Sequence, residues 1–210
     1  EGDVTSTTDA SGIDDAAILA AMTRKTGEIQ QVPTAVSAIK INGQRAYARV
    51  RAGEDVVLQP RAVTVSRFEA TETRRHDEVI DVDVEVTCSS GTYVRALARD
   101  VGADLGVGGH LTALRRTRIG PFDLTAACPD IFADDAGAPA PMTMAEAARL
   151  SFPVVEVTDD QEAAIRVGRR VDMIVPADVT AMIAGTGEML ALYRPDDERR
   201  GQSRAICVLV

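Results

Sequence analysis

Two arginines occupy unusual positions in a segment that has helical periodicity. Apolar residues recur at helical spacing between residues 94 and 105, which predicts a helix. Arg95 would lie in its first turn, where the helix dipole disfavours a cation by about 0.3–1 kcal/mol, and Arg99 would add a like charge to the same face. Together these features indicate a functional site in which a carboxylate or phosphate from elsewhere faces Arg95. The alternative is an exposed arginine that is tolerated at small cost.

Positive charge is concentrated in two windows of an acidic chain. The 210 residues include 32 acidic and 23 basic side chains, and their net charge of -9 by itself disfavours a polyanionic partner. Residues 24–51 nevertheless carry a net charge of +5, and residues 93–118 a net charge of +3. Each window contains a tyrosine, Tyr47 or Tyr93, and arginine beside an aromatic ring is typical of surfaces that contact phosphates and unpaired bases. Ordinary solvated helix faces would give the same charge counts.

The remaining reactive residue types show no spacing typical of a metal or nucleophile site. His76 and His110 are isolated, and we expect both to be structural or exposed. Cys88, Cys128 and Cys207 are odd in number and widely separated, which argues against a zinc site and a disulfide framework and fits a cytoplasmic protein. No apolar run approaches the ~20 residues of a membrane span, and the first residues do not resemble a signal peptide.

Four helices and strands are expected in the first half of the chain. Residues 14–25 read as a capped helix. Residues 79–87 alternate apolar with acidic side chains, which predicts an antiparallel strand whose acidic face is solvated and not catalytic. A weaker strand is expected at 61–69, and the polar residues 71–78 would join the two strands as a loop or hairpin. The glycine run 106–109 follows the helix at 94–105, which favours a helix end and turn over a dinucleotide-binding loop.

The last third of the chain reads as a separate small α+β module. Residues 133–142 lack periodicity and combine Ala, Gly, Pro and acid, which predicts a connector. Beyond it, Thr143 and Thr158 each precede a Glu or Gln by three residues, the pattern of a helix capping box. Strands are expected at 188–194 and 204–210, on either side of a charged turn.

Four stretches of the sequence together resemble the TruB family of tRNA pseudouridine synthases, between about residues 5 and 132. The most specific of them, at 88–106, is similar to the family pattern C-S-x-G-T-Y-I-R-x-L-x-x-D-L-G-x-x-L-G, and the last 60 residues are similar to the PUA-like module that ends actinobacterial members. The four stretches are TSTTDASG (5–12), GEIQQVPTAVSAIKINGQRAYARVRAG (27–53), CSSGTYVRALARDVGADLG (88–106) and HLTALRRTRIGPF (110–122).

The resemblance implies isomerisation of the T-loop uridine of tRNA, position 55, to pseudouridine by a cytoplasmic monomer that uses an Asp nucleophile, no cofactor and no metal. In such enzymes the target base is flipped out and stacked on a tyrosine. Arg95 is similar to the arginine that pairs with the nucleophile, Tyr93 to an active-site tyrosine, and Leu114 to an apolar residue near the target base. The basic windows would then line an RNA groove, and the candidate phosphate contacts are Lys40, Arg45, Arg115 and Arg116.

The sequence departs from the family at its start. The family's nucleophile belongs to a G-x-L-D-P-x-A-x-G motif, and no Asp of this chain has that context. We expect the nucleophile, and the tyrosine on which the base stacks, to lie upstream of Glu1, because Asp3 and Asp9 match the motif poorly. The chain would then begin inside the catalytic domain, and these 210 residues alone would be inactive.

The expected architecture is α+β, with a mixed, mainly antiparallel sheet and flanking helices. Residues 1–150 would be the later part of a pseudouridine-synthase domain with a connector, and residues 151–210 the PUA-like module. The main alternative function is a non-catalytic module that binds structured RNA. A globular interaction domain with incidental arginine clusters is the third reading, and the motif at 88–106 makes it the weakest.

Overall fold

The structure is a computed structural model that describes residues 6–33, 40–41, 44–45, 58–127 and 140–209. Helices and mainly antiparallel strands form two compact units, residues 1–114 and residues 115–210. The α+β architecture expected from the sequence is therefore confirmed. In the described part of the chain, no helix is long and apolar enough to cross a membrane.

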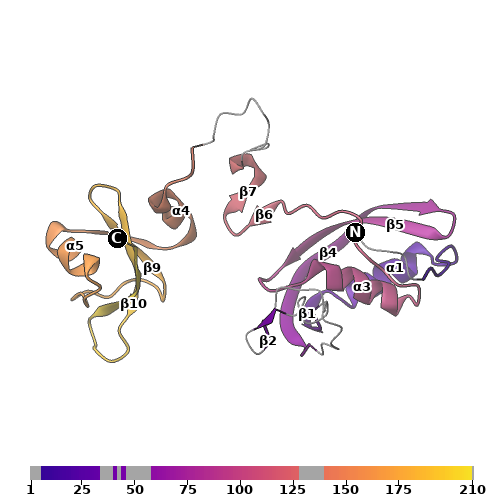
Figure 1. Cartoon of the computed structure of the whole chain (residues 1–210), viewed down its shortest axis with the longest axis horizontal. Coiled ribbons are helices and arrows are strands. Elements are labelled where there is room, and N and C mark those ends of the chain that lie inside the picture. Colours follow the sequence, from indigo (N-terminus) through magenta and orange to yellow (C-terminus); the bar gives the residue numbers. More distant parts are fainter. Residues whose placement is uncertain (1–5, 34–39, 42–43, 46–57, 128–139, 210) are drawn as a thin grey trace. The chain divides into compact units, whose positions relative to one another are not determined.

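A three-stranded antiparallel sheet organises the first unit, in the order β1-β4-β5 (Figure 1). The strands are β1 (Gly27–Gln31), β4 (Arg61–His76) and β5 (Val79–Cys88). The strand expected at 79–87 is confirmed, and the one expected at 61–69 is confirmed but too short. Two further short strands, β2 (Lys40–Ile41) and β3 (Gln44–Arg45), pair with each other.

The loop expected at 71–78 is wrong, because β4 continues to His76 and only Asp77 and Glu78 form the turn. Cross-strand ion pairs explain the difference. Arg74 donates two hydrogen bonds of 2.9 Å to the Asp83 carboxylate, and Arg67 lies 2.7 Å from Glu85. Polar residues that pair across a ladder stabilise a strand as apolar residues do. Asp83 and Glu85 of β5 are thus exposed, as expected, and they pair with Arg74 and Arg67 of β4.

Two helices pack on this sheet and against each other (Figure 1). Helix α1 (Asp15–Thr23) begins where the Asp14 carboxylate accepts a hydrogen bond of 2.7 Å from the Ala17 N–H, and it buries Ile18, Ala21 and Met22. Helix α3 (Val94–Asp104) buries Ala96, Leu97 and Gly102. Both helices confirm the sequence predictions to within two residues at each end.

The end of α3 packs closely against the glycine turn that follows it. Gly106 has φ of +76° and Gly108 of +74°, and the N–H of Gly108 donates to the Gly102 carbonyl at 3.0 Å. A Cβ atom on Gly102 would lie 2.1 Å from the carbonyl carbon of Gly108, which leaves no room for any side chain. The glycine run therefore ends the helix and lets the chain turn back, as the sequence analysis predicted.

Replacement of Gly102 by alanine should consequently destabilise the first unit. Overpacking of this kind costs about 1–3 kcal/mol, and here the clash is with backbone that has little freedom to move. The control is Gly12→Ala, because a Cβ atom there would meet no atom within 4 Å. Urea denaturation should show the loss for Gly102→Ala alone, and equal midpoints for the two variants would contradict the packing described.

The second unit contains a four-stranded sheet in the order β11-β10-β9-β8, in which only β8 and β9 are parallel. Both predicted capping boxes are confirmed, at Thr143 and at Thr158. The strands expected at 188–194 and 204–210 are confirmed as β10 and β11, and most of the expected connector lies outside the described residues. The elements are β6 (Arg118–Ile119), β7 (Phe122–Asp123), η1 (Leu124–Ala126), α4 (Met144–Ser151), β8 (Val154–Val157), α5 (Asp159–Arg166), β9 (Thr180–Ala184), β10 (Met189–Pro195) and β11 (Ser203–Val208).

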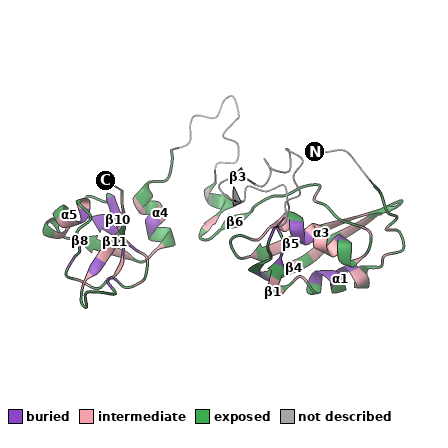
Figure 2. Ribbon diagram, turned by 60° about the horizontal axis from the view of Figure 1, so that its bottom comes forward, coloured by how far each residue is buried: buried purple, intermediate pink, exposed green. Residues whose placement is uncertain are grey.

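The core of the second unit lies along β9 and β10, whose residues are mostly buried (Figure 2). Tyr193 is fully buried, and its hydroxyl donates a hydrogen bond of 2.6 Å to the Arg169 carbonyl. Arg170 pairs with Asp196, whose side chain is inaccessible to solvent, and this hydrogen bond lowers the pKa of the Asp196 carboxyl. A buried polar group with a partner avoids the cost of desolvation. This unit therefore has an independent core.

Candidate functional site

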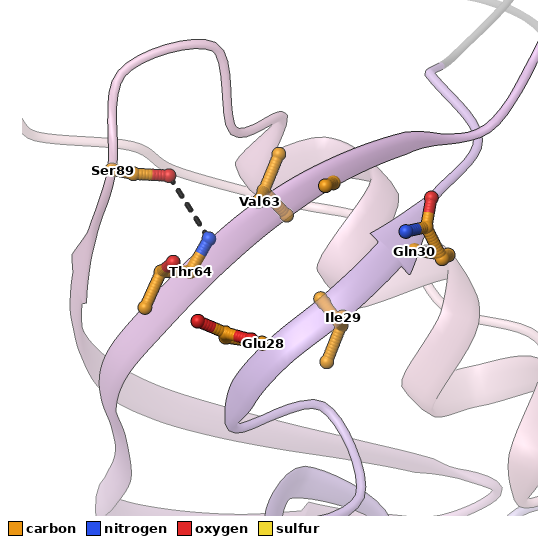
Figure 3. Close-up of a pocket in the computed structure, with 7 residues that line it drawn as sticks. Glu28, Ile29, Gln30, Val63, Thr64 and Ser89 are labelled. Carbon is orange, nitrogen blue, oxygen red and sulfur yellow. Dashed lines mark hydrogen bonds between the residues drawn. The ribbon is translucent and has the colours of Figure 1, made fainter.

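The candidate site is the start of α3, which the chain enters from β5 through a short turn. The turn is fastened to β4 by two hydrogen bonds: the Ser89 N–H donates to the Thr64 carbonyl at 2.8 Å, and the Thr64 N–H donates to Ser89 Oγ at 3.0 Å (Figure 3). Gly91 has φ of +82°, a conformation that glycine adopts without strain. These hydrogen bonds to the sheet therefore fix the turn that leads to Tyr93, the residue just before α3.

Gln31, the last residue of β1, holds the backbone of Tyr93. The Tyr93 N–H donates a hydrogen bond of 2.8 Å to Gln31 Oε1, and Gln31 Nε2 donates one of 3.1 Å to the Tyr93 carbonyl. The same carbonyl accepts the N–H groups of Ala96 and Leu97, so it begins the helix. Gln31 is only 1% exposed. One buried amide therefore binds both polar groups of the residue at which α3 starts.

Arg95 and Arg99 lie one turn apart, but their surroundings differ. Arg99 donates a hydrogen bond of 2.7 Å to the Val32 carbonyl and another of 2.7 Å to Asp100. Arg95 is exposed and forms no hydrogen bond or ion pair with any residue that the structure describes. Arg99 thus fastens the helix to the end of β1, whereas Arg95 remains available to an anion. That an anion faces Arg95 stays a prediction.

The two basic windows meet at the far end of α3. Asp104 accepts hydrogen bonds of 3.1 Å from both Arg24 and Lys25, and these cations lower the pKa of its carboxyl. Two basic residues of the first window are therefore paired with one acid of the second, which offsets one of their two charges. Lys40 and Arg45 lie opposite each other where β2 pairs with β3, but their side chains, like all of Tyr47, lie outside the described residues.

The last predicted contact residues adjoin the boundary between the two units. Leu114 ends the first unit and is 61% exposed, and Arg115 and Arg116 begin the second. Both arginines are exposed, without a hydrogen bond or ion pair to any part of the chain that the structure places. Their availability is consistent with a contact to phosphate, and their role stays a prediction.

The histidines and the neighbouring surface depression do not extend this site. His76 Nε2 lies 3.6 Å from Asp81 at the tip of the hairpin, and His110 is exposed. Among the described residues, no group of three or more His, Cys, Asp or Glu could hold a metal ion. A depression of about 370 Å³ lies over β1 and β4 beside Ser89 (Figure 3), and neither Tyr93 nor Arg95 lines it.

Gln31 is the residue of this site that the sequence analysis missed. Its signal is present in the sequence, because Ile29 and Gln31 share one face of β1 and that face points inward. A polar side chain on a buried face needs a hydrogen-bond partner. The partner, Tyr93, lies 62 residues away, and only the tertiary structure identifies it.

The sequence matches two domains of one family. Residues 1–94 match the TruB family pseudouridylate synthase N-terminal domain, and residues 95–130 match the tRNA pseudouridylate synthase B C-terminal domain. The chain is 82% identical over 210 residues to a protein of Cutibacterium acnes named tRNA pseudouridine synthase B, and it spans 71% of that relative's length. A protein of the same name from Rhodococcus jostii is 48% identical, and the whole chain spans 67% of it.

Two solved structures have a similar fold. A Cbf5-Nop10-Gar1 complex matches with a TM-score of 0.60 at 24% identity, over 96% of this chain and 62% of that chain. An H/ACA RNP bound to a substrate RNA containing 2'-deoxyuridine matches with a TM-score of 0.55 at 23% identity, over 96% of this chain and 61% of that chain. At these identities the likeness concerns the fold, and it agrees with the architecture expected from the sequence.

Proposed function

The chain belongs to the TruB family of pseudouridine synthases, and we propose on this basis that the protein isomerises a uridine of tRNA to pseudouridine. The observation that carries the proposal is Arg95, which stands unpaired among the described residues at the anchored start of α3, within the most specific family motif. The finer proposal is that the substrate is the T-loop uridine at position 55 and that a monomer in the cytoplasm performs the reaction.

The proposed reaction moves one bond and leaves the composition of the uridine unchanged. A carboxylate nucleophile attacks C1′ of the ribose, the bond between N1 of uracil and C1′ breaks, and the detached uracil rotates. The bond between the carboxylate and C1′ breaks again when uracil rejoins the ribose, so the carboxylate is regenerated. A bond between C5 and C1′ then forms, C5 loses its proton, and N1 ends with a proton. No electrons are gained or lost, so the reaction requires no redox cofactor.

In this scheme Arg95 pairs with the nucleophilic carboxylate and holds it ionised, as a cation at short range does. Tyr93 and Leu114 would contact the target base. We propose that the nucleophile is an Asp outside these 210 residues, because no Asp here has the family's motif context. Asp9 fits poorly on structural grounds too, since its carboxylate already accepts the Ser11 N–H at 2.8 Å.

The test of the proposed function is the release of tritium from a T-arm stem-loop that carries [5-³H]uridine at position 55. Formation of the C5–C1′ bond displaces the label into water, so one tritium should be released for each pseudouridine formed. A stem-loop labelled at another uridine is the control. If the full-length protein binds the stem-loop and releases no tritium, the alternative function, a non-catalytic RNA-binding module, is favoured.

Arg115 and Arg116 should make the binding of tRNA depend on salt. Each phosphate contact releases counterions and contributes about 0.7–0.9 to the slope of log Kd against log salt. We therefore expect the variant Arg115→Ala/Arg116→Ala to bind more weakly and to have a slope smaller by about 1.5. The control is Arg74→Ala, because Arg74 is already paired with Asp83. An unchanged slope in the double variant would remove both residues from the RNA interface.

A further inference from the structure

We propose that Gln31 is a positioning residue for the isomerisation, which acts by fixing the peptide of Tyr93 and hence the direction in which Arg95 projects from α3. The inference rests on the proposed function. Gln31 is buried and its amide binds on both sides, with one hydrogen bond from the Tyr93 N–H and one to the Tyr93 carbonyl. Arg95 follows two residues later, so a movement of the Tyr93 peptide moves the guanidinium.

The start of α3 has none of the usual devices that hold a helix N-terminus. The residue at the cap position is Tyr93, whose side chain makes no capping hydrogen bond, and the first turn contains no acidic residue. Ser, Thr, Asp or Asn at that position would satisfy a free N–H group from within the helix. Here the side-chain amide of Gln31, at the end of β1, hydrogen-bonds to the backbone of the cap residue. The position of the helix start therefore depends on the sheet.

A second hydrogen bond joins the same end of β1 to Arg99, six residues beyond Tyr93 on α3. Arg99 donates to the carbonyl of Val32, the residue after Gln31. With both contacts in place, α3 is restrained from sliding along β1 and from rotating about its own axis. Displacement of a catalytic group by about 1 Å can cost about 100-fold in rate. Loss of the Gln31 contacts should therefore slow the chemical step more than it weakens RNA binding.

The first test replaces Gln31 in the full-length protein by leucine, which fills a similar volume but cannot form hydrogen bonds. We expect the single-turnover rate on a labelled T-arm stem-loop to fall by about tenfold or more, while Kd for the stem-loop changes by less than about threefold. The control is Gln30→Leu, the exposed neighbour on the same strand, which should keep the wild-type rate. Rates are compared at a temperature where melting curves show each variant to be folded.

The second test, Gln31→Glu, separates positioning from stability. The ionised carboxylate can still accept the Tyr93 N–H but cannot donate to the Tyr93 carbonyl, whereas the protonated carboxyl can do both. Burial raises the pKa of a carboxyl group. We therefore expect the rate of this variant, relative to wild type, to increase several-fold as the pH falls from about 8 to about 6.

Three outcomes would count against the inference. A wild-type rate in Gln31→Leu would overturn it. It would also be overturned if Gln31→Leu lost rate and RNA affinity in parallel and if the rate of Gln31→Glu, relative to wild type, did not change with pH. If the wild-type protein itself releases no tritium, the proposed function fails first and removes the premise. If Gln31→Leu does not fold, Gln31→Glu, which matches glutamine in size, decides by its pH dependence.

Discussion

Replacement of Arg95 by alanine in the full-length protein should lower the rate of pseudouridine formation by at least about 100-fold and leave the affinity for tRNA nearly unchanged. The structure gives the reason for this separation. Arg95 is exposed and makes no hydrogen bond or ion pair to the described part of the chain, so its removal breaks no such contact there. A group that only organises the reacting carboxylate contributes to the rate and not to ground-state binding.

The matched variants for this prediction are Arg95→Lys and Arg99→Lys. Lysine keeps the charge but lacks the planar pair of donors, so Arg95→Lys should recover only part of the lost rate. Arg99 donates to the Val32 carbonyl and to Asp100, and lysine there keeps the charge and a donor, so Arg99→Lys should lower the rate less than Arg95→Lys does. Full activity of Arg95→Ala in single-turnover assays would exclude the role proposed for this residue.

The second large effect concerns the 210 residues by themselves, which should form no detectable pseudouridine. Loss of a catalytic nucleophile costs about 10⁴–10⁶-fold in rate, and no Asp of this chain stands in the family's nucleophile motif. The measurement is tritium release by the 210-residue chain beside the full-length protein, both at saturating enzyme. Circular dichroism must show the expected helices and strands, so that inactivity is not a consequence of unfolding.

A point variant tests directly whether Asp9 could be the nucleophile. Asp9→Asn in the full-length protein should keep the wild-type rate, because the Asp9 carboxylate accepts the Ser11 N–H, a hydrogen bond within its own turn that lowers its pKa. Turnover by the 210-residue chain, or inactivity of Asp9→Asn, would place the nucleophile inside this sequence.

Local signals in the sequence were sufficient for most of the elements. Asp14 caps α1 by binding an N–H three residues away, and Thr143 and Thr158 do the same for α4 and α5. Such contacts join residues within one turn, so their types and spacing identify them. The prediction for 71–78 was wrong because the strand there depends on partners across the ladder: Arg74, by itself typical of a loop, pairs with Asp83 on β5.

For the candidate site, the sequence by itself singled out the residue on which the catalytic predictions rest. An arginine in the first turn of a helix is locally unfavourable, and the residue type and its position in the periodic pattern are enough to single out Arg95. The family resemblance then supplied the roles for Tyr93 and Leu114, and those roles stay predictions.

Only the tertiary structure decided how Arg95 differs from Arg99 and what holds the start of their helix. The two arginines are equivalent by type and spacing. Arg99, however, reaches a carbonyl 67 residues away, and Gln31 reaches a peptide 62 residues away. Contacts between segments so distant in sequence depend on how β1 and α3 are brought together by the sheet, and no local pattern encodes that arrangement. The sequence therefore identified the candidate cation, and the fold identified the amide that binds the backbone at the start of its helix.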